Sequence, residues 1–184
     1  MPLVQTPLEK NLQLPQFQLP MVTGGIWSTR SLPKQEVSVF MFICNHCPYV
    51  KAIEDRLISL GQELRNQGVP LIGICSNDAQ AYPEDSFERL RDRALEKHYS
   101  FPYLHDETQA VARQFGAVCT PDFFVFSREG QLAYRGRLDD FWKDASQVTR
   151  QELLQAVKDL RIQNHIGFQE VPSMGCSMKW KTSP

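Results

Sequence analysis

The chain has 184 residues, 42% of them hydrophobic, and its 20 basic side chains nearly balance its 21 acidic ones. This length and composition fit one globular domain over residues 1–184 and exclude a disordered chain. Without a basic block, a signal-like apolar run or a membrane-spanning stretch, we expect a cytoplasmic protein with no nucleic-acid or membrane partner.

In chain order, the elements alternate between strands and helices. Residues 1–36 are rich in Pro, Gln and Leu and contain a Gly-Gly turn, so we expect a short hairpin or extended lead-in that covers one sheet edge. An unbroken apolar run at 37–43 predicts a strand buried on both faces. Apolar residues at helical spacing then predict a helix that stops before Gly68, and a second buried strand follows at 69–75.

The rest of the sequence shows three helix starts and one hairpin. Each helix start pairs a capping side chain with Glu or Gln three residues later. The tail, residues 164–184, has no regular period and is expected to be irregular. The expected elements are a helix from Asp85 and Glu88, an extended piece at 101–104, a helix from Asp106 to Gly116, a hairpin of strands 122–127 and 131–136, and a helix from Thr149 and Glu152.

The order β-α-β-α-(β)-α-β-β-α places a parallel crossover beside an antiparallel hairpin. It predicts an α/β fold with a central mixed β-sheet, helices on both faces and an N-terminal extension. In such sheets, functional groups collect at the carboxyl ends of the parallel strands. Cys44 and Cys47 fall at this end of the sheet.

The segment Cys44-Asn45-His46-Cys47 joins the first buried strand to the first long helix. A helix N-terminus stabilises a thiolate, and two thiols at this spacing can close a disulfide ring. We expect Cys44 to be the thiolate and Cys47, further into the helix, to be less reactive. Zinc sites usually take a second ligand pair, and no second C-x-x-C or H-x-x-x-H occurs. Two structural cysteines are a further alternative, but Asn45 and His46 would fill a core poorly.

Together with Cys119-Thr120-Pro121 before an apolar strand, this motif resembles the thioredoxin-like superfamily. The chain is most similar to a peroxiredoxin-like subfamily of redoxins related to AhpC/TSA, over roughly residues 17–181. The resemblance implies a thioredoxin-like three-layer fold and a cis bond before Pro121, with Thr120 and Pro121 forming a free edge that aligns a substrate. It also rests on residues 45–51, 76–78, 103–104, 106–107, 134–140 and 175–180.

Departures from the thioredoxin pattern are informative. Ser38 stands where thioredoxins carry a buried aspartate as a proton relay, and Ile43 stands where they carry a tryptophan. His46 matches the histidine before the second cysteine in protein disulfide isomerases and in bacterial periplasmic disulfide oxidases. An imidazole there stabilises the reduced form and raises the reduction potential.

The peroxiredoxin pattern P-x-x-x-T-x-x-C fits neither cysteine. Counted back from Cys44, its proline and threonine positions hold Val37 and Met41. Counted back from Cys47, they hold Phe40 and Cys44. Direct peroxidase activity is therefore disfavoured.

The sequence predicts a thiol–disulfide oxidoreductase with no cofactor or bound metal, in which Cys44 attacks a substrate disulfide and Cys47 resolves the mixed disulfide. Its partners would be a disulfide-containing protein or a small-molecule thiol substrate, and a reductase or thiol that donates electrons. Two alternatives stay open: a thiol peroxidase that uses Cys44 with Cys47 or Cys176, and a Cu or Zn site formed by Cys44, Cys47, His46 or Cys176.

Three further cysteines complete the set of five, too few and too irregularly spaced for a secreted disulfide scaffold. Cys176 is either a relay thiol on a tail that folds over the site or a cysteine packed on the surface beside Trp180. Cys119 is either a relay thiol near the site or points into the core. Cys75, at a strand end, is best explained as a buried structural cysteine.

Overall fold

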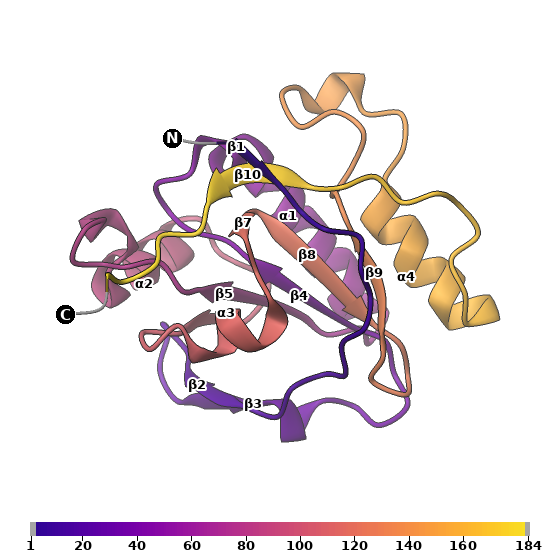
Figure 1. Cartoon of the computed structure of the whole chain (residues 1–184), viewed down its shortest axis with the longest axis horizontal. Helices are drawn as coiled ribbons and strands as arrows, with labels where there is room; N and C mark the ends of the chain where they lie inside the picture. Colours follow the sequence, from indigo (N-terminus) through magenta and orange to yellow (C-terminus); the bar gives the residue numbers. More distant parts are fainter. Residues whose placement is uncertain (1–2, 183–184) are drawn as a thin grey trace.

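The structure is a computed structural model and describes residues 3–182. Five strands form its central sheet: β4 (Ser38–Phe42), β5 (Leu71–Cys75), β6 (Tyr103–His105), β8 (Asp122–Phe126) and β9 (Leu132–Gly136). Their spatial order is β6-β5-β4-β8-β9, as Figure 1 shows. β4, β5 and β6 pair in parallel, whereas β8 pairs antiparallel with both β4 and β9. This is the predicted mixed sheet, with the parallel crossover beside the hairpin.

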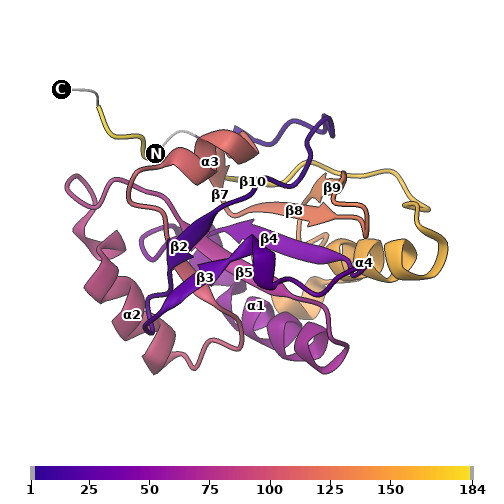
Figure 2. The same ribbon diagram turned by 90° about the horizontal axis from the view of Figure 1, so that it is seen from below.

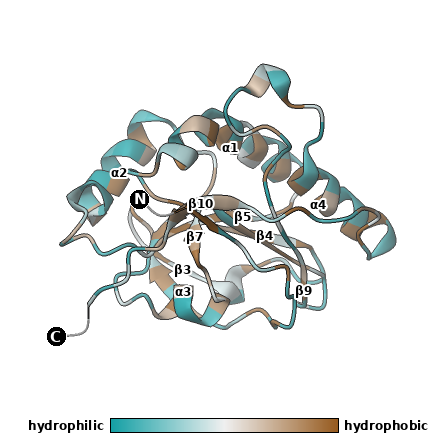
Figure 3. Cartoon of the chain, turned by 45° about the horizontal axis from the view of Figure 1, so that its top comes forward, coloured by the Kyte–Doolittle hydropathy of each residue, from teal (hydrophilic) through white to brown (hydrophobic). Residues whose placement is uncertain are grey.

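Helices cover both faces of the sheet, as predicted. They are α1 (Pro48–Asn66), α2 (Phe87–Glu96), α3 (Ala110–Phe115) and α4 (Glu152–Gln163). α1, α2 and α4 lie on one face, and α3 lies on the other (Figure 3). The second face is also covered by a hairpin of β2 (Gln18–Pro20) and β3 (Ile26–Ser28), which lies in front of β4 and β5 in Figure 2. Among residues 3–182, no helix combines the length and apolarity needed to cross a membrane.

The side chains of β4 alternate between the two cores. Val39 and Met41 pack with α1 and α4, whereas Phe40 and Phe42 pack with Phe115 of α3. Because successive strand residues point to opposite faces, one uninterrupted apolar run supplies both cores. This packing fixes the position of the loop that follows β4.

Residues before β4 cover the β6 edge of the sheet, as predicted. Met21 forms a bridge with Leu104, and the Val22 N–H donates to the Tyr103 carbonyl at 2.9 Å. The Gly-Gly turn between β2 and β3 uses positive φ angles of 108° and 83°, which glycine adopts without steric cost. The N-terminal extension is therefore an edge cover.

The tail contains a strand, contrary to the expectation of an irregular segment. β10 (Met174–Ser177) lies between β1 (Leu3–Gln5) and β7 (Cys119–Thr120) in a second, antiparallel sheet, visible near the top of Figure 1. Gly175 allows this close approach, because an added Cβ would overlap the Thr120 carbonyl oxygen and lie 2.6 Å from its carbon. A four-residue strand with a glycine shows no hydrophobic period.

None of the three predicted capping boxes is formed. α3 begins at Ala110 rather than after Asp106, and its N-cap residue Gln109 makes no side-chain cap hydrogen bond. Ser86, rather than Asp85, accepts the Arg89 N–H at 3.5 Å and caps α2. Thr149 donates to Asp140, and α4 begins after it without a side-chain cap. Asp and Thr near a helix start can bind other partners instead of the helix. For Asp85, these other partners lie in the loop after β4.

Candidate active site

The loop from Cys44 to Cys47 lies at the carboxyl end of β4. α1 begins at Pro48, so Cys47 is its N-cap residue and Cys44 lies before the helix. Proline is favoured at the first helical position, where its missing N–H is not needed. This corrects the prediction that Cys44 lies at the helix N-terminus and Cys47 inside the helix. The Val50 N–H, in the first turn of α1, is the helix donor that lowers the pKa of Cys47.

Thr120 faces both thiols across the end of the sheet. The Thr120–Pro121 peptide bond is cis, which confirms the prediction. The Cys44 Sγ lies 3.3 Å from the Thr120 Oγ1, and the protonated Cys47 thiol donates to the Thr120 carbonyl oxygen at 3.0 Å. The structure therefore brings together Cys44, Cys47, Thr120 and Pro121, as the resemblance implies.

Hydrogen bonding and burial shift the pKa values of the two thiols in opposite directions. The hydrogen bond from Cys44 lowers the pKa of the Cys47 thiol, and this effect, with hydrogen bonds from the Thr120 hydroxyl and the Val50 N–H, outweighs burial. Burial, followed by the hydrogen bond to Cys47 and the nearby Asp85 carboxylate, raises the pKa of the Cys44 thiol. These opposite shifts favour the thiolate on Cys47 and the proton on Cys44, whereas the sequence predicted the thiolate on Cys44.

The lowered pKa gives a testable pH dependence. In the reduced protein we expect thiolate absorbance in the ultraviolet at neutral pH, lost only well below the ordinary cysteine pKa of about 8.5. Cys47→Ser should remove this absorbance. Cys44→Ala should shift its midpoint upward, because it removes the strongest stabilising hydrogen bond. Absorbance that survives in Cys47→Ser but disappears in Cys44→Ala would restore the roles predicted from the sequence.

A buried carboxylate holds the loop and its histidine. Asp85 accepts hydrogen bonds from the backbone N–H groups of Asn45 at 2.8 Å and His46 at 3.3 Å, and from the Asn77 amide at 2.9 Å. The His46 Nδ1 lies 2.5 Å from the second Asp85 oxygen, and the imidazole stacks on Tyr82 with ring centroids 4.7 Å apart. Sequence reasoning missed Asp85 because it resembled a helix cap. The adjacent Ser86, an equally good cap, was the signal that could have revealed it.

Candidate metal ligands gather at one place among residues 3–182. Ligand atoms of Cys44, His46 and Asp85 lie within 4.8 Å of one another. Two ligands on one Zn²⁺, each about 2.0–2.3 Å from the ion, would stand roughly 3 Å or more apart. The 2.5 Å contact between His46 and Asp85 is shorter and fits a shared proton. This geometry favours a hydrogen-bonded pair over the Cu or Zn alternative.

Of the three remaining cysteines, one lies at the site and two lie beside it. Cys176, on β10, lies opposite Thr120, and burial followed by the nearby Cys47 thiol raises the pKa of Cys176 to about 12. Cys119 donates to the Pro121 carbonyl at 3.5 Å, and burial raises its pKa. Cys75 is fully buried, and burial raises its pKa too. Of these three cysteines, Cys176 is the one that lies opposite Thr120, the residue that contacts both Cys44 and Cys47.

The backbone edge beside the thiols is occupied, which corrects the expectation of a free edge. Cys176 and Ser177 of β10 pair with Thr120 and Cys119 of β7, and the Ser173 hydroxyl donates to the Pro121 carbonyl at 3.0 Å. The side chains of all three site cysteines are buried. The protein's own C-terminal strand therefore covers the site.

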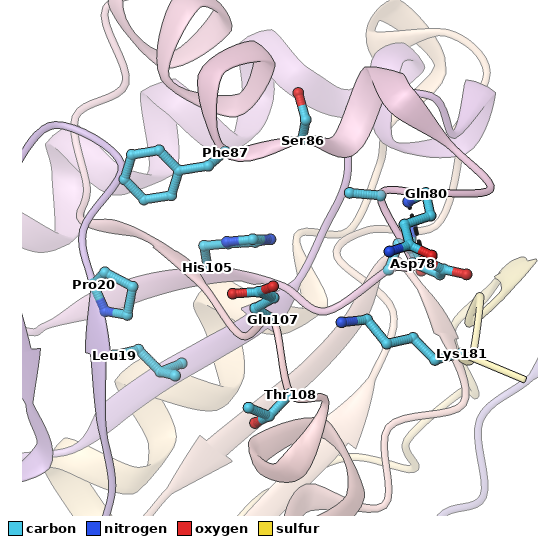
Figure 4. Close-up of a pocket in the computed structure, with 12 residues that line it drawn as sticks. Leu19, Pro20, Asp78, Gln80, Ser86, Phe87, His105, Glu107, Thr108 and Lys181 are labelled. Atoms are coloured by element: carbon cyan, nitrogen blue, oxygen red, sulfur yellow. Dashed lines mark hydrogen bonds between the residues drawn. The ribbon is translucent and has the colours of Figure 1, made fainter. Parts of the chain in front are cut away.

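A cavity of about 510 Å³ lies beyond the carboxyl ends of β5 and β6. Figure 4 shows His105, Glu107 and Lys181 lining it, with Asp78 nearby. No cysteine lines this cavity. Its wall residue Asn77 donates to Asp85, so this hydrogen bond links the cavity to the loop that carries the thiols.

Comparison with known proteins shows the family to which this chain is similar. The AhpC/TSA family model matches residues 11–135. An uncharacterized conserved protein from Geobacillus kaustophilus is 40% identical, with a TM-score of 0.93 over 100% of this chain and 99% of that one. A hypothetical protein from Sinorhizobium meliloti 1021 is 34% identical, with a TM-score of 0.90 over 97% and 98%. No curated protein matches.

A more distant structure extends the likeness of fold. The Peroxidoxin BcpB from Mycobacterium tuberculosis is 17% identical, with a TM-score of 0.62 over 85% of this chain and 99% of that one. At this identity the likeness concerns the fold alone. The central mixed sheet with helices on both faces is thus a thioredoxin-like fold, as predicted.

Proposed function

This chain belongs to the AhpC/TSA family, and we propose that it is a thiol–disulfide oxidoreductase whose dithiol is Cys47 and Cys44. Thiol redox chemistry is the activity that the family supports. The observation that carries the finer proposal is a pair of buried thiols that contact the same residue: the Cys44 Sγ lies 3.3 Å from the Thr120 hydroxyl, and the Cys47 Sγ lies 3.0 Å from the Thr120 carbonyl oxygen. A lone nucleophilic thiol does not need a second thiol in contact with the same residue.

The reaction begins at Cys47. Its thiolate attacks one sulfur of a substrate disulfide, forms a mixed disulfide and releases the other substrate sulfur as a thiolate. Cys44 then loses its proton to that thiolate and attacks the Cys47 sulfur, which releases the second substrate thiol and leaves a Cys44–Cys47 disulfide. A reductase or small thiol in a reducing cytoplasm restores the dithiol. Thr120 and Pro121 align the substrate once β10 leaves the edge.

A thiol peroxidase is the second candidate. A single thiolate at a helix N-terminus is also what attack on a peroxide requires, and the fold is shared with a peroxidoxin. The Cys47 sulfenic acid would then condense with Cys44. Against this candidate, the proline and threonine of the peroxiredoxin pattern are replaced by Phe40 and Cys44.

One paired assay separates the two activities. The reduced protein is given either a small aromatic disulfide or hydrogen peroxide, each with the same regenerating thiol. We expect catalytic turnover with the disulfide, and peroxide consumption no faster than that of the regenerating thiol alone. Peroxide turnover without disulfide turnover would overturn the proposal in favour of the peroxidase.

We expect the reduction potential to be more positive than the value of about −270 mV for thioredoxin. The cause is the stabilised Cys47 thiolate, which favours the reduced form. His46→Gln should lower the potential by about 30 mV or more if the imidazole contributes to this stabilisation, since about 30 mV corresponds to 1.4 kcal/mol. Titration in glutathione buffers measures both values. An unchanged potential in the variant would remove His46 from the redox mechanism.

A further inference from the structure

β10 occupies the place that an extended substrate would take. It pairs antiparallel with β7 at the residue that faces both thiols, with Cys176 directly opposite Thr120. Added strands of this kind are a general mode of peptide recognition, in which the backbone provides affinity and side chains provide specificity. The side chain that β10 presents here is a thiol.

Cys47 has a thiol neighbour on each of two elements. Cys44 in the loop after β4 and Cys176 on β10 both shift the pKa of Cys47. Cys176 lies opposite Thr120, whose carbonyl oxygen is 3.0 Å from the Cys47 Sγ. The thiol groups that shift the pKa of Cys176 include Cys47, and Cys44 is not among them. All three side chains are at most 3% exposed. Cys47 is therefore the thiol that both Cys44 and Cys176 act on.

The ends of β10 are anchored on both sides of this contact. Before the strand, the Ser173 hydroxyl donates to the Pro121 carbonyl at 3.0 Å. After it, the Lys179 N–H donates to Asn77 at 2.9 Å, and the Met178 N–H donates to the Val118 carbonyl at 2.9 Å. These bonds hold the Cys176 thiol against Cys47 and distinguish it from a cysteine on a loose tail.

We propose that Cys176 is a third redox thiol, which exchanges with the Cys44–Cys47 disulfide to form a Cys47–Cys176 disulfide. The Cys176 thiol loses its proton and its sulfur attacks the Cys47 sulfur. The Cys44–Cys47 bond breaks as the Cys47–Cys176 bond forms, and Cys44 leaves as a thiolate that takes up a proton. One disulfide is exchanged for another, so no further oxidant is consumed. The new disulfide ties β10 to the loop before α1 and blocks the substrate edge.

This inference rests on the proposed function only for the origin of the first disulfide. Diamide can supply that disulfide directly, so the exchange is testable without substrate turnover. The full-length protein is oxidised with diamide, digested without reduction and mapped by mass spectrometry. In the wild type we expect both Cys44–Cys47 and Cys47–Cys176 peptides. A wild type that contains Cys44–Cys47 alone at equilibrium would overturn the proposal.

Matched variants identify the partner of Cys176. Cys44→Ser should oxidise to Cys47–Cys176, whereas Cys47→Ser should form Cys44–Cys176 much more slowly, because Cys176 lies opposite the Thr120 carbonyl that contacts Cys47. Cys119→Ala, a buried neighbour on β7, should leave the disulfide pattern unchanged. Equal formation of Cys44–Cys176 in Cys47→Ser would show a loose tail and would refute the geometric argument.

A variant that keeps every thiol tests the role of β10. In the Cys44→Ser background, Gly175→Ala places a methyl group against the Thr120 carbonyl and should push β10 off β7. We expect the Cys47–Cys176 disulfide to form at least tenfold more slowly. Circular dichroism confirms that the variant is folded. An unchanged rate in the folded variant would show that pairing with β7 does not position Cys176.

Discussion

Replacing Cys47 by serine should abolish turnover of disulfide substrates, with a loss of about 10³-fold or more, the scale seen when an enzyme loses its nucleophile. The reason is that the helix N-terminus, the Thr120 hydroxyl and the Cys44 thiol all stabilise a thiolate on Cys47. Cys44→Ser keeps this thiolate and should still react once with a substrate disulfide. Stopped-flow measurement of single turnover and of steady-state turnover separates these two behaviours.

The fate of the mixed disulfide sharpens this comparison. Cys44→Ser retains Cys176 next to Cys47, so the mixed disulfide should be released through Cys176. In Cys44→Ser/Cys176→Ser it should accumulate, visible as an adduct in mass spectrometry under non-reducing conditions. Cys75→Ala is the matched control, because Cys75 is fully buried in β5. If Cys47→Ser formed the adduct instead, Cys44 would be the attacking thiol after all.

The fold was predictable because its signals are local and redundant. The apolar run that became β4 serves two cores, so it contains no polar interruption. The proline at position 121 follows a polar residue and opens a buried strand, and its cis bond agrees with the resemblance. Strand order then followed from the element order, since only a few topologies satisfy the connection rules.

The roles predicted for the two cysteines depended on the residue at which the helix begins. Starting the helix before Cys44 puts Cys44 at the N-terminus, whereas starting it at Pro48 puts Cys47 there. Pro48 was the visible signal for the second choice, because proline favours the first helical position. Boundaries set by a single turn are less certain than the existence of a long amphipathic helix. Here that uncertainty decided which thiol the sequence predicted as the nucleophile.

β10 was beyond local sequence reasoning. Its partner β7 has two residues, and its own centre is glycine and cysteine. Neither strand shows alternation, so the pairing depends on residues far apart in the chain meeting at the end of the sheet. The free substrate edge implied by the resemblance was therefore wrong for this chain.

Asp85→Ala should lower the free energy of unfolding by roughly 3–5 kcal/mol, because each buried donor left without an acceptor costs about 1–3 kcal/mol. Asp85 is fully buried, and its loss would leave the His46 imidazole, the Asn77 amide and two backbone N–H groups without their acceptor. Urea unfolding of the reduced protein measures this loss. Asp85→Asn keeps an acceptor oxygen but not the charge, and it should cost less, roughly 1–3 kcal/mol.

The same substitution should disturb the dithiol, because Asp85 holds the loop that carries it. Once the backbone N–H groups of Asn45 and His46 lose their acceptor, the loop can rotate, and formation of the Cys44–Cys47 disulfide should slow in proportion to the misplacement. Glu84→Ala is the matched control: this neighbouring carboxylate is 65% exposed and lies 3.8 Å from Lys51. An exposed pair contributes about 1 kcal/mol or less, so both stability and oxidation rate should be nearly unchanged. Equal losses in Glu84→Ala and Asp85→Ala would mean that the turn as a whole, rather than the buried Asp85 carboxylate, supports the site.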